Sequence, residues 1–258
     1  MSHWWYLAAP ALPLLLPQAL WVKKTALRLP DAALPWQGVC APGRSDPSSS
    51  CSALRLLVIG ESTVAGVGVD TQQQALCGQL AQQLADAQSR PVIWQACGRN
   101  GATAAVCRQE LLPMLEPERW DLVVIVLGVN DTTHLTPRWR WRGELMRLLE
   151  HFNARADQVL VTAVPPLGRF HALPQPLRGW FGLRAGLLDL DAQRCCAMGR
   201  ALYVPMAGIF ERHYLARDGY HPSQAGYALW ATDIVRSLAQ SSCLSPSAAI
   251  SASGSSSG

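Results

Sequence analysis

Five short apolar runs, separated by helix-like stretches, constrain the fold of this chain more than any other feature. The runs cover residues 54–59, 92–97, 122–127, 159–164 and 201–204. Runs of this length that are almost continuously apolar are typical of strands buried on both faces of a parallel sheet. The helix-like stretches cover residues 72–87, 102–115, 139–154, 183–200 and 223–238. This alternation predicts a three-layer α/β/α domain around a central, mostly parallel, five-stranded sheet.

The bulk composition excludes several classes of protein. The chain has 258 residues, which is enough for one α/β domain with a large core. A hydrophobic content of 49% and a charged content of 16% exclude an intrinsically disordered protein. The net charge of +4 is too small to indicate a nucleic-acid partner. The composition leaves the oligomeric state open.

The chain divides into four segments by composition. Residues 1–30 form an apolar arm, and residues 31–52 are rich in proline and serine, which is typical of a linker. Residues 53–240 hold all five strand-like runs and form the expected catalytic domain. Residues 241–258 are rich in serine, alanine and glycine, so we expect a disordered tail.

The apolar arm bears on where the protein is located. Residues 4–22 are apolar but contain three prolines, and Lys23, Lys24 and Arg28 follow them. A signal peptide has the opposite order, and the positive-inside rule would place the domain on the cytoplasmic side. Because the prolines disfavour a straight spanning helix, we expect peripheral contact with a membrane interface. An arm packed on the domain, and a periplasmic or secreted location, are the alternatives.

The eight cysteines do not form a metal-binding pattern, because no two are spaced as CxxC. Cys77, Cys97 and Cys107 fall in predicted helices and strands, where buried free thiols are expected. Cys40 and Cys51 flank a Pro/Ser-rich stretch and could form a disulfide if that stretch is extracytoplasmic. The sequence leaves this pairing open.

Polar residues follow the ends of the apolar runs. Ser62 comes directly after the first run, in Gly-Glu-Ser-Thr, and Asn130 comes after the third, in Gly-Val-Asn-Asp. Gly101 follows the second run and precedes a predicted helix, so its backbone N–H is available for an anion. Because the carboxyl ends of parallel strands meet at one edge of a sheet, we expect these groups to lie together.

Asp218 and His221 lie three residues apart, in Asp-Gly-Tyr-His just before the last predicted helix. In a tight loop this spacing lets the carboxylate bind imidazole Nδ1 and leaves Nε2 to face a serine. His171 is an alternative histidine, but it has no nearby aspartate. These residues predict acyl transfer through Ser62.

The four motifs, in this order, resemble those of the SGNH hydrolases, also called the GDSL family. The resemblance covers residues from about 54 to about 238 and implies a flavodoxin-like sheet. It assigns Ser62 as nucleophile, Asp218 and His221 as orienting acid and base, and Ser62, Gly101 and Asn130 as the oxyanion hole. Glu61 departs from the family pattern, which has Asp there, although that position is not itself catalytic.

The resemblance implies a serine esterase or lipase that acts on a small-molecule or lipid ester and needs no metal and no organic cofactor. An acyltransferase or deacetylase with the same triad stays open, as does an inactive flavodoxin-like binding module. Neither the acyl nor the alcohol part of the substrate can be derived from the residues.

Two further segments flank the expected site. Residues 138–142 alternate arginine and tryptophan, which fits either an exposed helix start or contact with anionic lipid headgroups. The proline-rich stretch 165–178 follows the fourth run, and we expect it to form one wall of the pocket.

Overall fold

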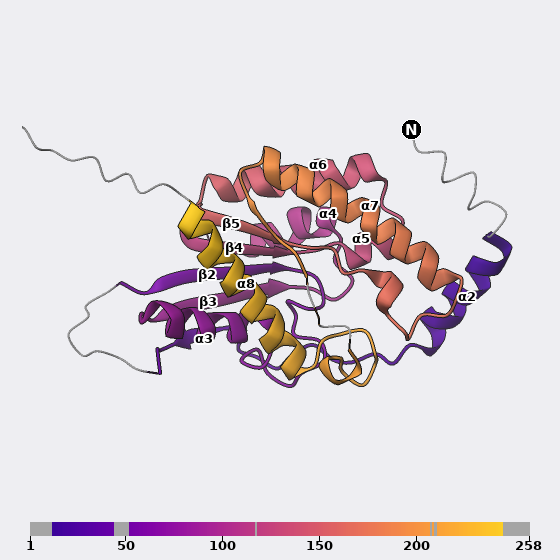
Figure 1. Cartoon of the computed structure of the whole chain (residues 1–258), viewed down its shortest axis with the longest axis horizontal. Helices are drawn as coiled ribbons and strands as arrows, with labels where there is room; N and C mark the ends of the chain where they lie inside the picture. The colour runs from indigo at the N-terminus through magenta and orange to yellow at the C-terminus, as the bar shows by residue number, and fades with distance from the viewer. Residues whose placement is uncertain (1–11, 44–51, 117, 207, 209–210, 245–258) are drawn as a thin grey trace, which may run out of the picture.

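The computed structural model describes residues 12–43, 52–116, 118–206, 208 and 211–244, and Figure 1 shows their arrangement. A six-stranded sheet lies at its centre, in the order β1-β3-β2-β4-β5-β6. The strands are β1 (Gln37–Cys40), β2 (Leu54–Gly60), β3 (Val92–Gly98), β4 (Trp120–Val126), β5 (Ala156–Thr162) and β6 (Leu202–Val204). Strands β2 to β6 pair in parallel, whereas β1 runs antiparallel to β3. The predicted mostly parallel sheet is therefore confirmed, with one more strand than expected.

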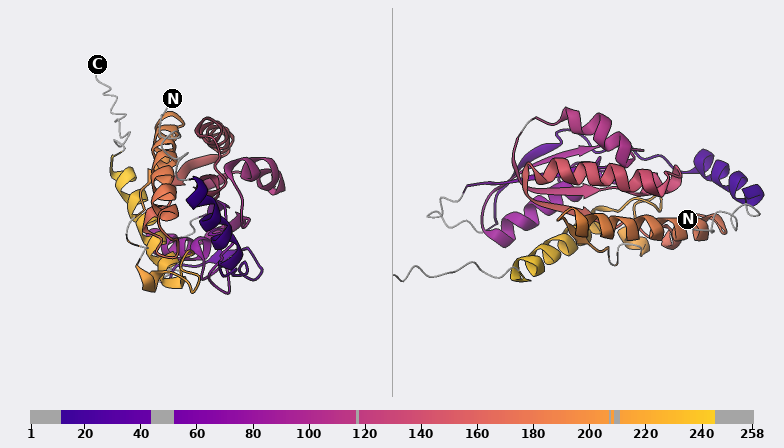
Figure 2. Two further views of the ribbon diagram at one scale, coloured as in Figure 1. Left: turned by 90° about the vertical axis from the view of Figure 1, so that its right-hand side faces the viewer. Right: turned by 90° about the horizontal axis from the view of Figure 1, so that it is seen from above.

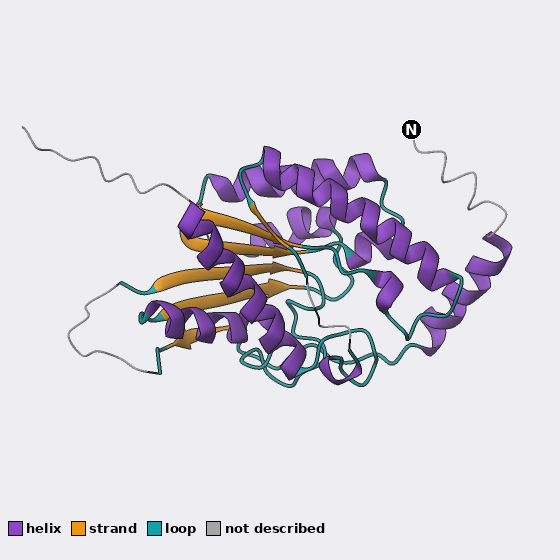
Figure 3. Cartoon of the chain, in the orientation of Figure 1, coloured by secondary structure: helices purple, strands orange, loops and turns teal. Residues whose placement is uncertain are grey.

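Helices cover both faces of the sheet. They are α2 (Leu12–Thr25), α3 (Leu76–Gln88), α4 (Ala104–Val106), α5 (Val129–Thr133), α6 (Arg138–Asn153), α7 (Leu177–Met198) and α8 (Gln224–Leu244). Helices α3 and α8 pack against each other on one face, and α6 and α7 pack together on the other (Figures 1 and 2). Figure 3 shows the strands between these two helical layers, which is the predicted three-layer α/β/α architecture.

The core explains why the central strands are almost entirely apolar: Arg55 and Asp121, each the second residue of its strand, are the exceptions. Leu56, Val58 and Ile59 of β2 are fully buried, as are Val124 and Ile125 of β4. Both strands have neighbours on each side and helices on each face, so neither has a solvent face that would need polar residues. Burying such side chains stabilises the fold by about 1.5–3 kcal/mol each.

Residues 37–40, expected in a linker, instead form the edge strand β1. The segment before it is also packed on the domain: Leu29 and Ala32 are buried, and Ala32 N–H donates to the Ala65 carbonyl at 2.9 Å. An edge strand of four residues is too short to show an alternating pattern, which is why the sequence alone did not indicate it. Cys40 is a free thiol, and Cys51, with which the sequence leaves a disulfide open, lies outside the described residues.

The helix predicted for residues 102–115 is a succession of three short turns. One turn of α-helix, α4, leads into a π-helical segment, Cys107–Leu111, and a 3₁₀ turn, Leu112–Met114. Thr103 caps the start, because its Oγ1 accepts from Val106 N–H at 3.4 Å. Pro113 lacks an N–H and cannot continue a helix, which explains the late break.

Two of the basic and aromatic residues at the start of α6, Arg138 and Trp141, hold the helix layer together. Arg138 donates two hydrogen bonds, at 2.7 and 2.8 Å, to the fully buried carboxylate of Asp191 on α7. Trp141 is fully buried and donates its Nε1–H to the Leu188 carbonyl at 3.0 Å. These two side chains are therefore structural and are not available for lipid headgroups.

Helix α2, formed by the apolar arm, contacts α7 at the end of the molecule toward which the parallel strands point (Figure 1). It has 14 residues and contains Pro17. Among the residues that the structure describes, no helix is both long and apolar enough to cross a bilayer. Residues 1–11 and 245–258, which include most of the expected tail, lie outside the described part of the chain.

Candidate active site

The predicted site residues lie close together because three strands end at the same level of the sheet. Gly60, the last residue of β2, pairs with Gly98 of β3 on one side and Val126 of β4 on the other. A Cβ at Gly60 would lie 2.0 Å from the Val126 carbonyl oxygen, so only glycine fits this exit. Ser62 follows two residues later and is therefore held at the carboxyl edge of the sheet.

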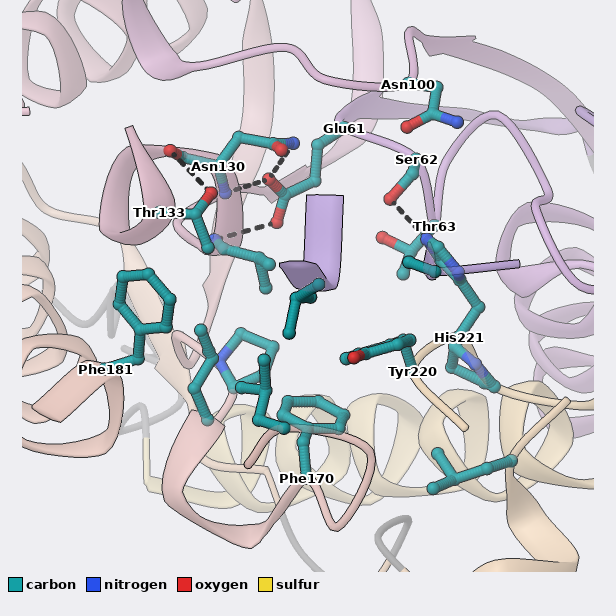
Figure 4. Close-up of a pocket in the computed structure, with 18 of the residues that line it drawn as sticks. Glu61, Ser62, Thr63, Asn100, Asn130, Thr133, Phe170, Phe181, Tyr220 and His221 are labelled. Atoms are coloured by element: carbon teal, nitrogen blue, oxygen red, sulfur yellow. Dashed lines mark hydrogen bonds between the residues drawn. The ribbon is translucent and has the colours of Figure 1, made fainter. Parts of the chain in front are cut away.

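The structure brings Ser62, His221 and Asp218 into one hydrogen-bonded chain. His221 Nε2 lies 2.9 Å from Ser62 Oγ, and His221 Nδ1 lies 2.6 Å from Asp218 Oδ2. Figure 4 shows the contact between Ser62 and the histidine ring at the edge of the cavity. Residues 159 positions apart in the sequence are thus within proton-transfer distance.

Asp218 is held in place by its own loop as well as by the imidazole. Its Oδ1 accepts from the backbone N–H groups of Tyr220 and His221, at 2.9 and 3.1 Å. Burial alone would raise the pKa of Asp218, but the hydrogen bonds from His221 and Tyr220 outweigh burial and hold the pKa below its ordinary value. The group is therefore a carboxylate at neutral pH, suited to fixing the tautomer of His221.

Glu61 binds the loop that carries Asn130. Its Oε2 accepts from the backbone N–H and the side-chain Nδ2 of Asn130, at 3.0 and 2.8 Å, and its Oε1 accepts from Val129 N–H at 3.1 Å. Glu61 is only 2% exposed, and burial raises its pKa to about 7 despite these hydrogen bonds. Ser62 and Asn130 are thus joined through one buried carboxyl group.

A second buried carboxyl group, Asp131, joins the Asn130 loop to the segment after β3. Asp131 Oδ2 accepts from Ala104 N–H at 2.8 Å, at the start of α4. Gly101 lies three residues before this contact, with a φ of +85° that favours glycine, and its neighbour Asn100 lines the cavity. The predicted oxyanion residues therefore lie on segments that Glu61 and Asp131 tie together.

An apolar cavity of about 520 Å³ opens beside Ser62 and His221. Its polar end holds these two residues with Asn100 and Asn130, and its other walls are mostly apolar. Those walls include Leu167, Phe170, Leu173, Leu177, Phe181 and Trp230. Figure 4 shows the rings of Phe170, Phe181 and Tyr220 across the cavity from the polar groups. The expectation that the proline-rich stretch lines the pocket is confirmed.

Two features of the site were not predicted from the sequence. Ala19, Val22 and Lys23 of α2 line the cavity, as does Ala26 just beyond the helix, so the apolar arm is part of the site. The anchoring role of Glu61 was not specified either, because it depends on a loop almost 70 residues away. His171, the alternative histidine, is exposed and contacts Arg178.

The sequence model of the GDSL-like lipase/acylhydrolase family matches residues 58–229. The chain belongs to this family. The match begins within β2 and ends in α8, so it covers Ser62, Gly101, Asn130, Asp218 and His221, but not the cavity wall formed by α2. The resemblance noted from the four motifs is therefore confirmed.

Known proteins agree with this assignment. A GDSL-like esterase of Mycobacterium tuberculosis is 27% identical over 184 residues, which is 68% of this chain; the match spans 59% of that esterase's length. The crystal structure of TesA superposes with a TM-score of 0.60 at 23% identity, covering 71% of this chain and 97% of TesA. A lipase/acylhydrolase of Enterococcus faecalis gives a TM-score of 0.55 at 23% identity, covering 73% and 96%. These structures share the fold.

Proposed function

We propose that this protein is a serine-dependent ester hydrolase that works through an acyl-enzyme. The observation that carries the proposal is the pair of hydrogen bonds, 2.6 and 2.9 Å long, that links Asp218 through His221 to Ser62 at the edge of an apolar cavity. An inactive binding module would not require this alignment of acid, base and hydroxyl.

In the first step His221 Nε2 takes the proton of Ser62 as Ser62 Oγ attacks the ester carbonyl. The ionised Asp218 stabilises the imidazolium that forms and keeps Nε2 directed at the serine. The imidazolium then gives its proton to the departing alcohol. This leaves the acyl group on Ser62 and a neutral histidine.

The oxyanion of the tetrahedral intermediate is held by the N–H groups of Ser62 and Gly101 and by the amide of Asn130. An amide nitrogen has two hydrogens; Asn130 uses one on Glu61 and keeps the other for the oxyanion. Because Glu61 fixes this amide before substrate arrives, no reorganisation is needed in the transition state.

Water completes the reaction. His221 removes a proton from the water that attacks the acyl carbonyl, and it returns that proton to Ser62 Oγ when the acid leaves. The enzyme is thereby regenerated without any other reactant.

The cavity supports an ester with an apolar acyl chain. Its aromatic and leucine-rich walls lie next to Ser62, so the acyl chain would occupy them while the carbonyl faces the polar end. We therefore propose a small-molecule or lipid ester as substrate.

Hydrolysis of p-nitrophenyl esters from acetate to laurate tests this function. We expect wild-type protein to hydrolyse the series and Ser62→Ala to lose activity, with the exposed Ser52→Ala as matched control. A fluorophosphonate should add one covalent adduct to wild type and none to Ser62→Ala. Equal rates or equal labelling of Ser62→Ala and wild type would contradict the proposal.

A further inference from the structure

Helix α2 is apolar on two opposite faces. Ala19 and Val22, three residues apart, line the cavity, and so does Ala26 just beyond the helix. Leu16 and Leu20, also four residues apart, lie on the other side and are 57% and 66% exposed. Exposed leucines on the face of a helix that is turned away from its own domain are typical of a face that contacts protein or lipid.

The domain holds α2 firmly by its inner face. Gln18 Nε2 donates to the Gln175 carbonyl at 2.7 Å, and Gln18 Oε1 accepts from Leu177 N–H at 3.2 Å. Leu15, one turn earlier on the same face, is only 4% exposed. The inner face is thus fixed against the start of α7, and the exposure of Leu16, Leu20 and Trp21 shows that the outer face is turned to the surroundings. Figure 2 shows α2 at one end of the molecule.

The outer face combines large apolar side chains with positive charge. Trp21 is 59% exposed and Leu27, just beyond the helix, is 51% exposed. Lys24 and Arg28 follow within the same stretch, and no acidic residue occurs from residue 12 to residue 30. Tryptophan, leucine and basic residues on one surface are the composition of helices that lie in the headgroup region of anionic bilayers.

We propose that the outer face of α2, formed by Leu16, Leu20, Trp21 and Lys24, seats the protein on an anionic phospholipid surface, together with Arg28 just beyond the helix. Because the inner face of the same helix lines the cavity, the acyl site lies one helix thickness from the lipid. An ester in the bilayer would then reach Ser62 without crossing bulk water. This last point rests on the proposed function, whereas the docking itself does not.

The positive charge of the outer face of α2 favours an anionic bilayer over a second copy of the chain as its binding partner. A second copy would bring the same basic residues face to face, which is unfavourable. An anionic surface offsets them, and each basic residue near such a surface strengthens binding roughly fivefold.

Vesicle flotation with the full-length chain tests the proposal. We expect binding to vesicles of 70% phosphatidylcholine and 30% phosphatidylglycerol, and much weaker binding to pure phosphatidylcholine or in 1 M salt. The variant Lys24→Gln/Arg28→Gln should bind the anionic vesicles roughly 25-fold more weakly. The variant Leu16→Ser/Leu20→Ser/Trp21→Ser should lose detectable binding.

The matched control replaces three exposed apolar residues elsewhere, in Met114→Ser/Leu190→Ser/Met198→Ser, and should bind as wild type does. Circular dichroism melting shows whether each variant is folded. Flotation is repeated with Ser62→Ala, so that a failure of the proposed catalysis leaves the docking result unaffected.

Three results would overturn the proposal. One is equal binding of the outer-face variant and wild type to anionic vesicles, and another is the absence of any vesicle binding by the folded full-length chain. The third is a dimer in solution that dissociates in the outer-face variant, because a second copy would then be the occupant of this face.

Discussion

Glu61 Oε2 accepts two hydrogen bonds from one residue, Asn130, through its backbone N–H at 3.0 Å and its side-chain Nδ2 at 2.8 Å. The residue next to the proposed nucleophile therefore sets the position of a proposed oxyanion donor. Substituting either Glu61 or Asn130 should therefore destabilise the transition state and lower kcat, with less effect on substrate binding.

Removing the Asn130 amide should reduce kcat. In Asn130→Ala we expect kcat to fall by about 10²–10³-fold with little change in KM, because an oxyanion donor acts on the transition state. Steady-state kinetics on p-nitrophenyl butyrate measures this. Asn153→Ala, at an exposed asparagine of α6, is the control. A wild-type kcat in Asn130→Ala would refute its role.

The raised pKa of Glu61 should appear in the pH dependence of stability. Burial moves this pKa from 4.5 to about 7, so the stabilising contribution is complete below pH 4.5 and is lost as the pH rises through about 7. Glu61→Gln cannot ionise. As the pH rises from 4.5 to about 7, its free energy of unfolding should therefore increase relative to that of wild type, by up to about 3 kcal/mol.

Urea unfolding at several pH values between 4 and 8.5 measures that difference. The exposed Glu150→Gln should change with pH as wild type does. Parallel curves for Glu61→Gln and wild type would show that Glu61 does not titrate in this range.

Asp218→Asn should fold normally and catalyse poorly. An asparagine amide facing Nδ1 would favour the wrong histidine tautomer, so we expect kcat to fall by about 10³–10⁴-fold. Activity and near-ultraviolet circular dichroism measure the two effects separately. Asp233→Asn, whose carboxylate pairs with Arg236 near the surface, is the matched control. Near-normal turnover in Asp218→Asn would exclude Asp218 as the orienting acid.

Filling the cavity from α2 should shorten the preferred acyl chain. Ala19→Phe places a ring where a long chain would lie, so we expect kcat/KM for laurate to fall at least about 10-fold while acetate is spared. Thr25→Phe, at an exposed position on the same helix, should leave the profile unchanged. If Ala19→Phe has the wild-type chain-length profile, α2 does not bound the acyl site.

The sequence allowed Ser62, Asn130, Asp218 and His221 to be grouped because each follows a strand end or precedes a helix, and the strands were recognisable from their apolar runs. That inference needs only the rule that parallel strands end at one edge. The structure places Ser62 and His221 in contact, as this rule requires.

The contribution of the N-terminal arm could not be predicted in the same way. The packing of Ala19 and Val22 against the cavity depends on where α7 begins, more than 150 residues away. Likewise, β1 exists because β3 offers it an open edge, and its own four residues carry no strand pattern. Tertiary contacts determine both the packing of α2 at the cavity and the formation of β1, so neither can be predicted from local sequence periodicity.

The pairing of β1 with β3 also bears on how the protein can be shortened. A protease that cut near residue 43 would release a piece holding both the outermost strand and one side of the acyl cavity. The trimmed remnant would present the bare backbone of β3 to other molecules and would tend to aggregate. Truncated variants made for expression should therefore keep α2 and β1.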